Sequence, residues 1–318
     1  MTDKIWDVIV VGSGPAGLTA ALYVTRGAAS TLVIAGEIWG GQLMLTTTVD
    51  NFPGFPEGIQ GPDLMRAMRK QAERFGAEFV EANLESLDTE KRPFALTAGD
   101  KVYTGKTVII ATGARTVWLD APGVSSLVGR GVSSCAPCDA PFFKEKKVAV
   151  VGGGDAAMEE ALVLSKHASE VTIIHRRDSF KASQIMQQKV LSDPKIKVIW
   201  NSEVSEAVGK EKLEKIILKN NKDGTTSELV VDGMFIAIGH KPDTDIFKGK
   251  IDLDERGFVS VGHRTKTNVD GIFVSGDVHD SYFKQAITAA GFGCMAAMEV
   301  LKYLDEMSGQ PPKSGLTY

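Results

Sequence analysis

The chain has 318 residues, which predicts two domains because most domains hold roughly 100 to 200 residues. Its 36 basic and 40 acidic residues give a net charge of -4, so the basic excess typical of nucleic-acid binders is absent. The longest apolar runs, 8–11 and 148–151, fall far short of the ~18 residues of a membrane helix, and the N-terminus lacks the pattern of a secretory signal. We expect a globular, cytoplasmic protein that neither binds nucleic acid nor spans a membrane.

The first landmark is an apolar strand that leads directly into a glycine-rich turn. Val8 to Val11 precede Gly12-Ser13-Gly14-Pro15-Ala16-Gly17, in which three glycines fill the pattern G-x-G-x-x-G. The first glycine permits a tight turn, the second lets the backbone approach a pyrophosphate, and the third lets the helix pack on the strand. The helix N-terminus then offers N–H groups and a positive dipole end to phosphate groups. We therefore predict a dinucleotide site at this turn.

The next strand of this unit, Thr31 to Ile34, indicates which nucleotide the site prefers. It is followed by Ala35-Gly36-Glu37, and Glu37 is a candidate acceptor for a ribose hydroxyl although it is offset by two residues from the usual place. No basic cluster follows the strand, so nothing favours a 2′-phosphate. The adenosine half of FAD would suit this site.

Three cysteines are too few for a disulfide scaffold, but two of them form the pair Cys135-Ala136-Pro137-Cys138, followed by Asp139. Cysteines at this spacing can close an exchange-active disulfide, and a neighbouring carboxylate can supply or remove a proton. Half of a zinc site is one alternative, although no second Cys or His pair lies at ligand spacing. An inert pair of small residues is the other. We expect a redox pair and no metal.

A second strand and glycine turn follow the cysteines. Val148 to Val151 lead into Gly152-Gly153-Gly154-Asp155-Ala156-Ala157, which fills the variant pattern G-x-G-x-x-A. One such match has an ordinary glycine turn as its alternative. Two matches, each after an apolar strand and before an alanine-rich helix, favour two nucleotide sites.

The strand after the second glycine turn is followed by basic residues, whereas the corresponding strand of the first unit is followed by an acidic one. Glu170 to Ile174 are followed by His175-Arg176-Arg177-Asp178 and then by Lys181. Two arginines stand where an acidic residue would favour a free ribose hydroxyl, and guanidinium groups bind phosphate in a bidentate fork. This pattern predicts NADPH rather than NADH, with a solvated basic loop as the alternative.

Three further strand and turn segments, 106–114, 233–240 and 271–277, set the architecture. The first two resemble the last strands of two similar nucleotide-binding units, and the third precedes an alanine- and glycine-rich helix near the C-terminus. We predict an α/β fold of two Rossmann-like domains with the second inserted into the first. Residues 1–114 and 245–318 would form a discontinuous FAD-binding domain. Residues 115–244 would form the NADPH-binding domain, which carries the Cys-x-x-Cys pair.

In this order, the motifs resemble those of the low-molecular-weight thioredoxin reductases, NADPH-dependent flavoproteins with two dinucleotide-binding folds. The resemblance covers nearly the whole chain. Besides the two glycine turns, the cysteine pair and the 175–178 stretch, it rests on Gly40-Gly41-Gln42-Leu43 with Thr46-Thr47-Thr48, Asn51-Phe52-Pro53-Gly54, Ala111-Thr112-Gly113-Ala114, Glu159-Glu160-Ala161, Gly276-Asp277-Val278 and Gln285-Ala286-Ile287-Thr288-Ala289-Ala290-Gly291.

The resemblance implies two sets of cofactor-binding residues. The FAD set comprises Gly12, Ser13, Gly14, Pro15, Ala16, Gly17, Ala35, Gly36, Glu37, Gly41, Gln42, Thr46, Asn51, Ala111, Thr112, Gly113, Gly276, Asp277, Val278, Lys284, Gln285 and Ala286. Within it, Asp277 would bind the ribityl chain. The NADPH set comprises Gly152, Gly154, Asp155, Ala156, His175, Arg176, Arg177, Lys181, Ile238 and Gly239.

The resemblance also implies a reaction. Hydride would pass from NADPH to the flavin and electrons from the flavin to the disulfide, with thioredoxin or a similar small dithiol protein as acceptor. Cys138 would face the flavin, Cys135 would attack the partner's disulfide, and Asp139 would act as acid and base. Members of the family form homodimers and rotate the inserted domain on a hinge, which here would lie near 113–116 and 239–244.

The chain departs from the family pattern at several positions. Pro137 stands where threonine is common, Lys181 and Lys284 stand where arginines are usual, and Ala140-Pro141 replace a typical glycine. A reductase of another small redox protein and a flavin-dependent dithiol oxidase are therefore alternative enzyme readings. A flavin-binding sensor without turnover is a non-enzyme alternative, against which the intact cysteine pair argues.

Overall fold

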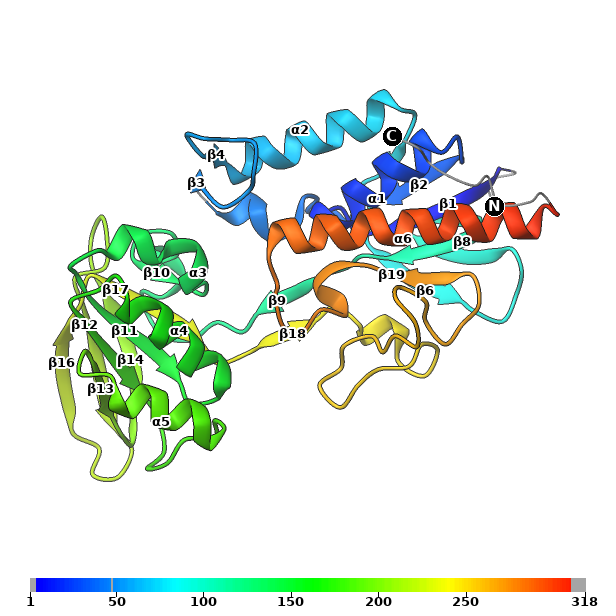
Figure 1. Ribbon diagram of the computed structural model, residues 1–318. Coiled ribbons are helices and arrows are strands. Elements are labelled where there is room, and N and C mark those ends of the chain that lie inside the picture. The colour runs from blue at the N-terminus through cyan, green and yellow to red at the C-terminus, as the bar shows by residue number, and fades with distance from the viewer. Residues whose placement is uncertain (1–3, 47, 310–318) are drawn as a thin grey trace. The chain divides into compact units, whose positions relative to one another are not determined.

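The computed structural model describes residues 4–46 and 48–309, which form two compact units (Figure 1). Unit 1 contains the described residues up to Arg115 and those from Lys241 onward, and unit 2 runs from Thr116 to His240. The sequence predicts boundaries after residues 114 and 244, so the first one differs by one residue and the second by four. Hydrogen bonds assign the segment after His240 to unit 1. The Asp243 carbonyl accepts from the Thr112 hydroxyl, and the Asp243 N–H donates to the Gly113 carbonyl.

Unit 1 is built on a seven-stranded sheet in the order β5-β2-β1-β8-β7-β6, with β19 also paired to β8. Its parallel part consists of β1, β2, β5, β8 and β19, while β6 and β7 run antiparallel. The strands are β1 (Ile5–Val11), β2 (Thr31–Ile34), β5 (Glu78–Val80), β6 (Leu84–Asp88), β7 (Phe94–Ala98), β8 (Lys101–Ile110) and β19 (Ile272–Val274). A separate pair is formed by β3 (Thr48–Val49) and β4 (Ile59–Gln60).

Residues 8–11 of strand β1 are all apolar and buried because both faces of this sheet are covered. Val8 and Val10 point into one hydrophobic core, whereas Ile9 and Val11 point into another. This is the alternation that a strand imposes on successive side chains. A strand buried on both faces contains a continuous apolar run, which is why the sequence marks β1 so clearly.

Helices α1 (Pro15–Arg26), α2 (Gly61–Arg74) and α6 (Ala286–Met307) belong to unit 1. Helices α1 and α6 run side by side in Figure 1 and pack closely, because a Cβ on Gly293 would lie 2.3 Å from the carbonyl oxygen of Ala16. By length and composition α6 could cross a membrane, with a mean hydropathy of 1.2. Its buried residues Ala296, Ala297 and Val300 instead join the core of the unit.

Unit 2 repeats this design around a five-stranded parallel sheet in the order β10-β17-β11-β12-β13. The strands are β10 (Val132–Ser133), β11 (Lys147–Gly152), β12 (Glu170–Ile174), β13 (Ile196–Ile199) and β17 (Gly233–Ala237). One face is covered by helix α4 (Asp155–Ser165), and α5 (Gln184–Ser192) packs against α4. An antiparallel sheet of β14 (Ser202–Val208), β15 (Lys215–Asn220) and β16 (Thr226–Val230) covers the other. The fold is therefore α/β with two Rossmann-like units, as the sequence predicts.

The chain passes between the units twice, through β9 (Ala114–Thr116) and β18 (His240–Pro242). These strands pair only with each other in the described part of the chain, as a two-stranded sheet. On the unit 1 side an ion pair between Arg115 and Asp243 joins the two segments. On the unit 2 side the Val117 N–H donates to the Gly239 carbonyl.

Candidate functional site: a disulfide and two glycine turns

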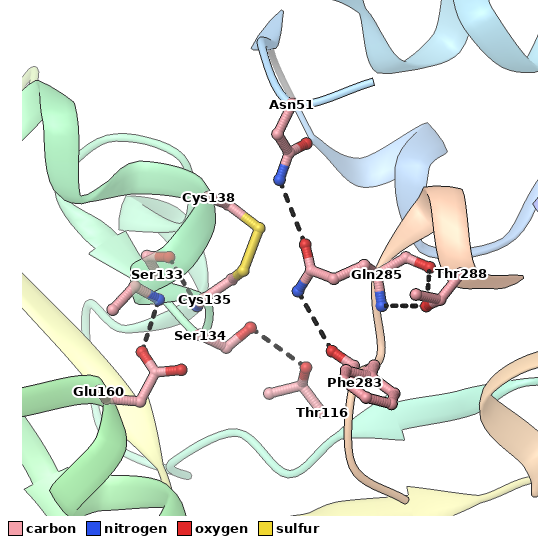
Figure 2. Close-up of a disulfide and its surroundings, with 11 residues drawn as sticks. Asn51, Thr116, Ser133, Ser134, Cys135, Cys138, Glu160, Phe283, Gln285 and Thr288 are labelled. Carbon is pink, nitrogen blue, oxygen red and sulfur yellow. Dashed lines mark hydrogen bonds between the residues drawn. A yellow bond between two sulfur atoms is a disulfide. The ribbon is translucent and has the colours of Figure 1, made fainter. Parts of the chain in front are cut away.

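Cys135 and Cys138 form a disulfide in unit 2, with their Cα atoms 5.3 Å apart (Figure 2). Cys135 directly precedes α3 (Ala136–Asp139), and Cys138 lies within this single turn. Both cysteines are half-buried, while Pro137 between them is exposed. The disulfide that the spacing suggested is therefore present. In this state the two sulfurs are bonded to each other, as a redox pair requires and as half of a zinc site or an inert pair does not.

Two polar side chains that sequence reasoning missed hold the disulfide turn in place. Ser133 is buried, and its hydroxyl accepts a hydrogen bond from the Cys135 N–H at 3.1 Å. Glu160 on α4 accepts a hydrogen bond from the Ala136 N–H at 2.5 Å. Glu160 belongs to a motif that the resemblance includes, but its spacing from the cysteines in sequence gives no sign of contact. Ser133 carries no sequence signal at all.

Asp139 lies at the end of the same turn, and its environment changes its acidity. Burial raises the pKa of its carboxyl group above the ordinary aspartate value, and a hydrogen bond with Ser133 opposes part of that rise. A carboxyl group with a raised pKa holds a proton more readily near neutral pH. Asp139 can therefore exchange protons beside the two sulfurs.

The first glycine turn has the geometry that a pyrophosphate site needs. A Cβ on Gly12 would lie 2.2 Å from the Ala111 oxygen, and one on Gly17 would lie 2.0 Å from the Gly12 oxygen, so both positions exclude side chains. Gly14 has nothing within 4 Å of its missing Cβ. Gly14 also begins α1, and no described side chain caps the N–H groups there. A helix start with no side-chain cap and open space beside Gly14 suits an anionic ligand.

Ser13 joins the glycine turn to the segment that follows β2. Its hydroxyl donates to the Ala35 carbonyl at 2.7 Å and accepts from the Gly40 N–H at 2.8 Å. Gly41 lies close to the turn, because a Cβ there would be 3.3 Å from the Gly14 Cα. The structure therefore brings these parts of the predicted FAD set together. Glu37 is exposed, with its backbone N–H bonded to the Asn83 side chain.

The start of α6 connects two other members of the predicted set. Asn51 donates from its side chain to the Gln285 side chain at 3.2 Å, as Figure 2 shows. Gln285 also begins α6 in a capping box with Thr288. Thr46 lies beside Gly61 at the start of α2. Thr47 of the same motif lies outside the described residues.

Asp277 is the strongest indication that unit 1 binds a further group. Burial raises the pKa of its carboxyl group to about 6, with a further contribution from the charge of Asp280. Its Oδ1 atom is buried and has no hydrogen-bond partner among the described residues, as is also true of Ser275 Oγ. Buried polar atoms are rarely left unpaired, so these atoms fit a ligand that supplies hydroxyl donors. The ribityl chain of a flavin has such donors.

Other predicted FAD residues make contacts of their own within unit 1. Thr112 donates to the Asp243 carbonyl at 2.8 Å, while Gly113 has a positive φ of 74° and nothing within 4 Å of its missing Cβ. Lys284 folds back on its own loop, donating to the Ser281 carbonyl at 2.6 Å. Gly276 packs against Ala16 of α1, because its Cβ would lie 2.7 Å from the Ala16 Cβ.

The second glycine turn repeats the first. A Cβ on Gly152 would lie 2.4 Å from the Ala237 oxygen, whereas Gly154 at the start of α4 has nothing within 4 Å. No described side chain caps α4 either. The Asp155 carboxylate is engaged by Ser183, whose N–H and hydroxyl lie 2.8 and 2.9 Å away. These bonds connect the starts of α4 and α5.

The loop after β12 separates a buried imidazole from exposed cations. His175 is buried beside Phe180 and Trp200, and its Nε2 lies 3.0 Å from the Ser179 carbonyl oxygen. Its ring also occupies the space beside Gly153, because a Cβ on that glycine would lie 2.2 Å from the ring. In contrast, Arg176 and Arg177 are exposed, and neither guanidinium forms an ion pair within the described part of the chain.

Lys181, Ile238 and Gly239 complete the predicted NADPH set. Lys181 is exposed, and its backbone N–H donates to the Gly153 carbonyl at 2.8 Å, which holds it beside the second glycine turn. Ile238 is 41% exposed directly after β17, and Gly239 has nothing within 4 Å of its missing Cβ. All members of this set lie in unit 2, and all members of the FAD set lie in unit 1.

Comparisons with known proteins agree with this geometry. The family model described as "Pyridine nucleotide-disulphide oxidoreductase" matches residues 6–293. A thioredoxin reductase of Streptomyces coelicolor is 49% identical over 99% of this chain and 100% of its own length. Among solved structures, thioredoxin reductase from Giardia duodenalis has a TM-score of 0.91 at 39% identity, covering 95% of this chain and 99% of that one. The enzyme from Streptococcus pyogenes also has a TM-score of 0.91, at 36% identity, covering 96% of this chain and 100% of that one.

Proposed function

The chain belongs to the pyridine nucleotide-disulphide oxidoreductase family, and from this premise we propose that it reduces the disulfide of thioredoxin with NADPH. Family membership implies the use of a pyridine nucleotide and a flavin. We assign FAD as the flavin and NADPH as the nucleotide. The observation that carries the proposal is the Cys135–Cys138 disulfide, which lies on a single helical turn in the unit that also holds the second glycine turn.

Residues of unit 1 supply the proposed FAD site. The N–H groups at the start of α1 bind the pyrophosphate, and Gly14 leaves room for it. Asp277 would accept a hydrogen bond from a ribityl hydroxyl through its Oδ1, which has no partner among the described residues. Bound FAD would supply a carrier that takes two electrons from reduced nicotinamide and gives them to a disulfide.

Residues of unit 2 supply the proposed NADPH site. The start of α4 offers N–H groups to the pyrophosphate beside Gly154. Arg176 and Arg177 extend their guanidinium groups toward solvent, where they bind a 2′-phosphate, and Lys181 adds a third positive charge. His175 remains buried and fixes the path of the backbone between β12 and these arginines.

The reduced cysteines carry out the exchange with thioredoxin. The Cys135 thiolate attacks one sulfur of the partner's disulfide, forming a mixed disulfide and releasing the other sulfur as a thiolate. Cys138 then attacks the Cys135 sulfur, which closes Cys135–Cys138 again and releases the second partner thiol. Asp139 takes the proton from Cys138 and gives one to the leaving thiolate. Its raised pKa suits it to both tasks.

We also propose that the enzyme is a cytoplasmic homodimer. The cytoplasm keeps partner thiols reduced at the expense of NADPH, and the chain has only three cysteines. An exposed apolar stripe on α6 supports the dimer. Ile287, Met295 and Met298 follow one another at helical spacing and are 44%, 43% and 42% exposed. Light scattering of the purified protein measures the oligomeric state directly.

An acceptor assay tests the proposed function. Purified protein is mixed with NADPH, thioredoxin and a thiol-reactive dye, and we expect dye reduction that depends on thioredoxin. The matched control is a thioredoxin whose two redox cysteines are replaced by serine. Turnover that is equally fast with this control contradicts the proposed acceptor. Oxygen consumption with added dithiols, in the absence of NADPH oxidation, would indicate a dithiol oxidase instead.

A further inference from the structure

The carboxylate of Glu160 lies against the backbone of the redox-active turn. Its Oε2 atom accepts a hydrogen bond from the Ala136 N–H at 2.5 Å, and Ala136 separates Cys135 from Pro137 (Figure 2). Glu160 is half-buried on α4, which packs against α3. Ala136 itself is fully buried. The contact therefore joins a partly desolvated charge to the first N–H of the turn that follows Cys135.

We propose that Glu160 is a positioning residue that makes the Cys135–Cys138 dithiol a stronger reductant. It does so by fixing the turn and by placing a negative charge beside it. This inference rests on the proposed electron relay through the two cysteines. It assigns the redox poise of the pair to a residue outside the Cys-x-x-Cys motif.

The direction of the effect follows from the charges of the two redox states. Reduction breaks the sulfur–sulfur bond with two electrons and two protons, giving two thiols, and one thiol then loses its proton to become the attacking thiolate. N–H groups at the start of a helical turn stabilise a thiolate, but the Ala136 N–H already donates to Glu160. The carboxylate also repels a thiolate. Because the disulfide carries no charge, Glu160 disfavours the reduced state relative to the oxidised one.

Charge and hydrogen bonding can be separated at this position. A glutamine at residue 160 keeps an oxygen that can accept from the Ala136 N–H, but it removes the charge. An alanine removes both. Asp139 is a second carboxyl group on the same turn and is unchanged in both variants. Glu203, which is exposed on β14 of the same unit, provides a control for the loss of one negative charge.

The experiment equilibrates the flavin-loaded enzyme with glutathione buffers of known potential and measures the oxidised fraction of the pair by alkylation and mass spectrometry. For Glu160→Gln we expect the equilibrium constant to shift about tenfold toward the dithiol, which corresponds to about 30 mV. Glu160→Ala should shift in the same direction. Glu203→Gln should match the wild type, and the Michaelis constant for NADPH should be the same in all four proteins.

Two failures are distinguishable. If the wild-type disulfide is reduced by NADPH and its equilibrium with glutathione is the same in Glu160→Gln, the inference is wrong while the proposed relay stands. A shift seen in Glu160→Ala alone also refutes the role of the charge. If instead NADPH leaves the wild-type pair oxidised in the flavin-loaded enzyme, the proposed relay itself is refuted.

Discussion

Asp139 and Asp277 are both carboxyl groups whose pKa is raised by burial, yet their surroundings differ. Asp139 has Ser133 as a hydrogen-bond partner and stands beside two sulfurs. Asp277 has an oxygen without a partner in the described part of unit 1. The sequence predicted both residues from their motifs. Only burial shows that one is suited to proton transfer and that the other lacks a partner.

We predict that Asp277→Asn weakens FAD retention and stabilises the flavin-free protein above about pH 6. The folded-state pKa of about 6 lies above the ordinary 3.8, so the folded state holds a proton that the unfolded state has lost. The cost of the buried charge therefore grows as pH rises from about 4 to about 6 and is complete above that range. Removing the buried charge should add roughly 3 kcal/mol to the free energy of unfolding near pH 8 and almost nothing near pH 4.

Thermal unfolding of the flavin-free protein at both pH values measures this effect, and flavin fluorescence measures FAD release. The affinity for FAD should fall about tenfold or more, as for the loss of a hydrogen bond to a charged group. Asp252→Asn, at an exposed position of unit 1, is the control. Unchanged FAD affinity in Asp277→Asn would exclude this carboxylate from the flavin site.

At the scale of elements, each glycine turn joins a strand to a helix, and its first glycine packs against a neighbouring strand end. A Cβ on the first glycine of each turn, Gly12 or Gly152, would clash with a neighbouring backbone carbonyl, whereas Gly14 and Gly154 at the helix starts face open space. The pattern of residues predicted these roles, because it encodes local backbone geometry. It could not predict that the helix from Ala286 to Met307 lies against α1, since that contact joins segments far apart in the chain.

The contact between α6 and α1 gives a matched pair of substitutions. Gly293→Ala would place a Cβ 2.3 Å from the Ala16 oxygen, so we expect a loss of roughly 1 to 3 kcal/mol in stability. Gly291→Ala, two residues away, meets nothing within 4 Å and should gain up to about 1 kcal/mol from helix propensity. Thermal unfolding compares the two variants. Equal melting temperatures would show that α6 does not pack on α1 this closely.

The loop after β12 permits a test of nucleotide choice. Replacing both Arg176 and Arg177 with alanine should raise the Michaelis constant for NADPH at least tenfold while changing that for NADH little, because only NADPH carries the 2′-phosphate. Steady-state kinetics with each nucleotide measures the ratio. The control replaces Lys189 on α5 and Lys219 on β15, two exposed cations of the same unit. Equal effects on NADPH and NADH would contradict the assignment.

At the scale of the whole molecule, the chain forms two units and passes between them twice. The predicted FAD residues all fall in unit 1, and the predicted NADPH residues and both cysteines fall in unit 2. In the proposed assignment, FAD therefore belongs to unit 1 and the Cys135–Cys138 disulfide to unit 2.

Counting electrons tests this relay. Anaerobic titration of the wild-type enzyme should consume two equivalents of a two-electron reductant per chain, one for the flavin and one for the disulfide. Cys138→Ser should consume one, retain its yellow colour and lose turnover with thioredoxin, because the Cys135–Cys138 disulfide can no longer form. A visible-absorbance titration gives both counts. A count of two in Cys138→Ser would mean that another group accepts the second electron pair.

The sequence by itself determined the features whose signal is local. These are the glycine turn after the first strand of each unit, the cysteine spacing, and the charge of the residues that follow the second strand of each unit. These depend on backbone geometry and side-chain type over fewer than about ten residues, so a linear pattern can specify them. Only the tertiary structure decided that Glu160 and Ser133 contact the disulfide turn, and that Asp277 is buried with an unpaired oxygen. Burial and contacts between distant residues depend on how the elements pack, and the spacing of residues along the chain does not specify that packing.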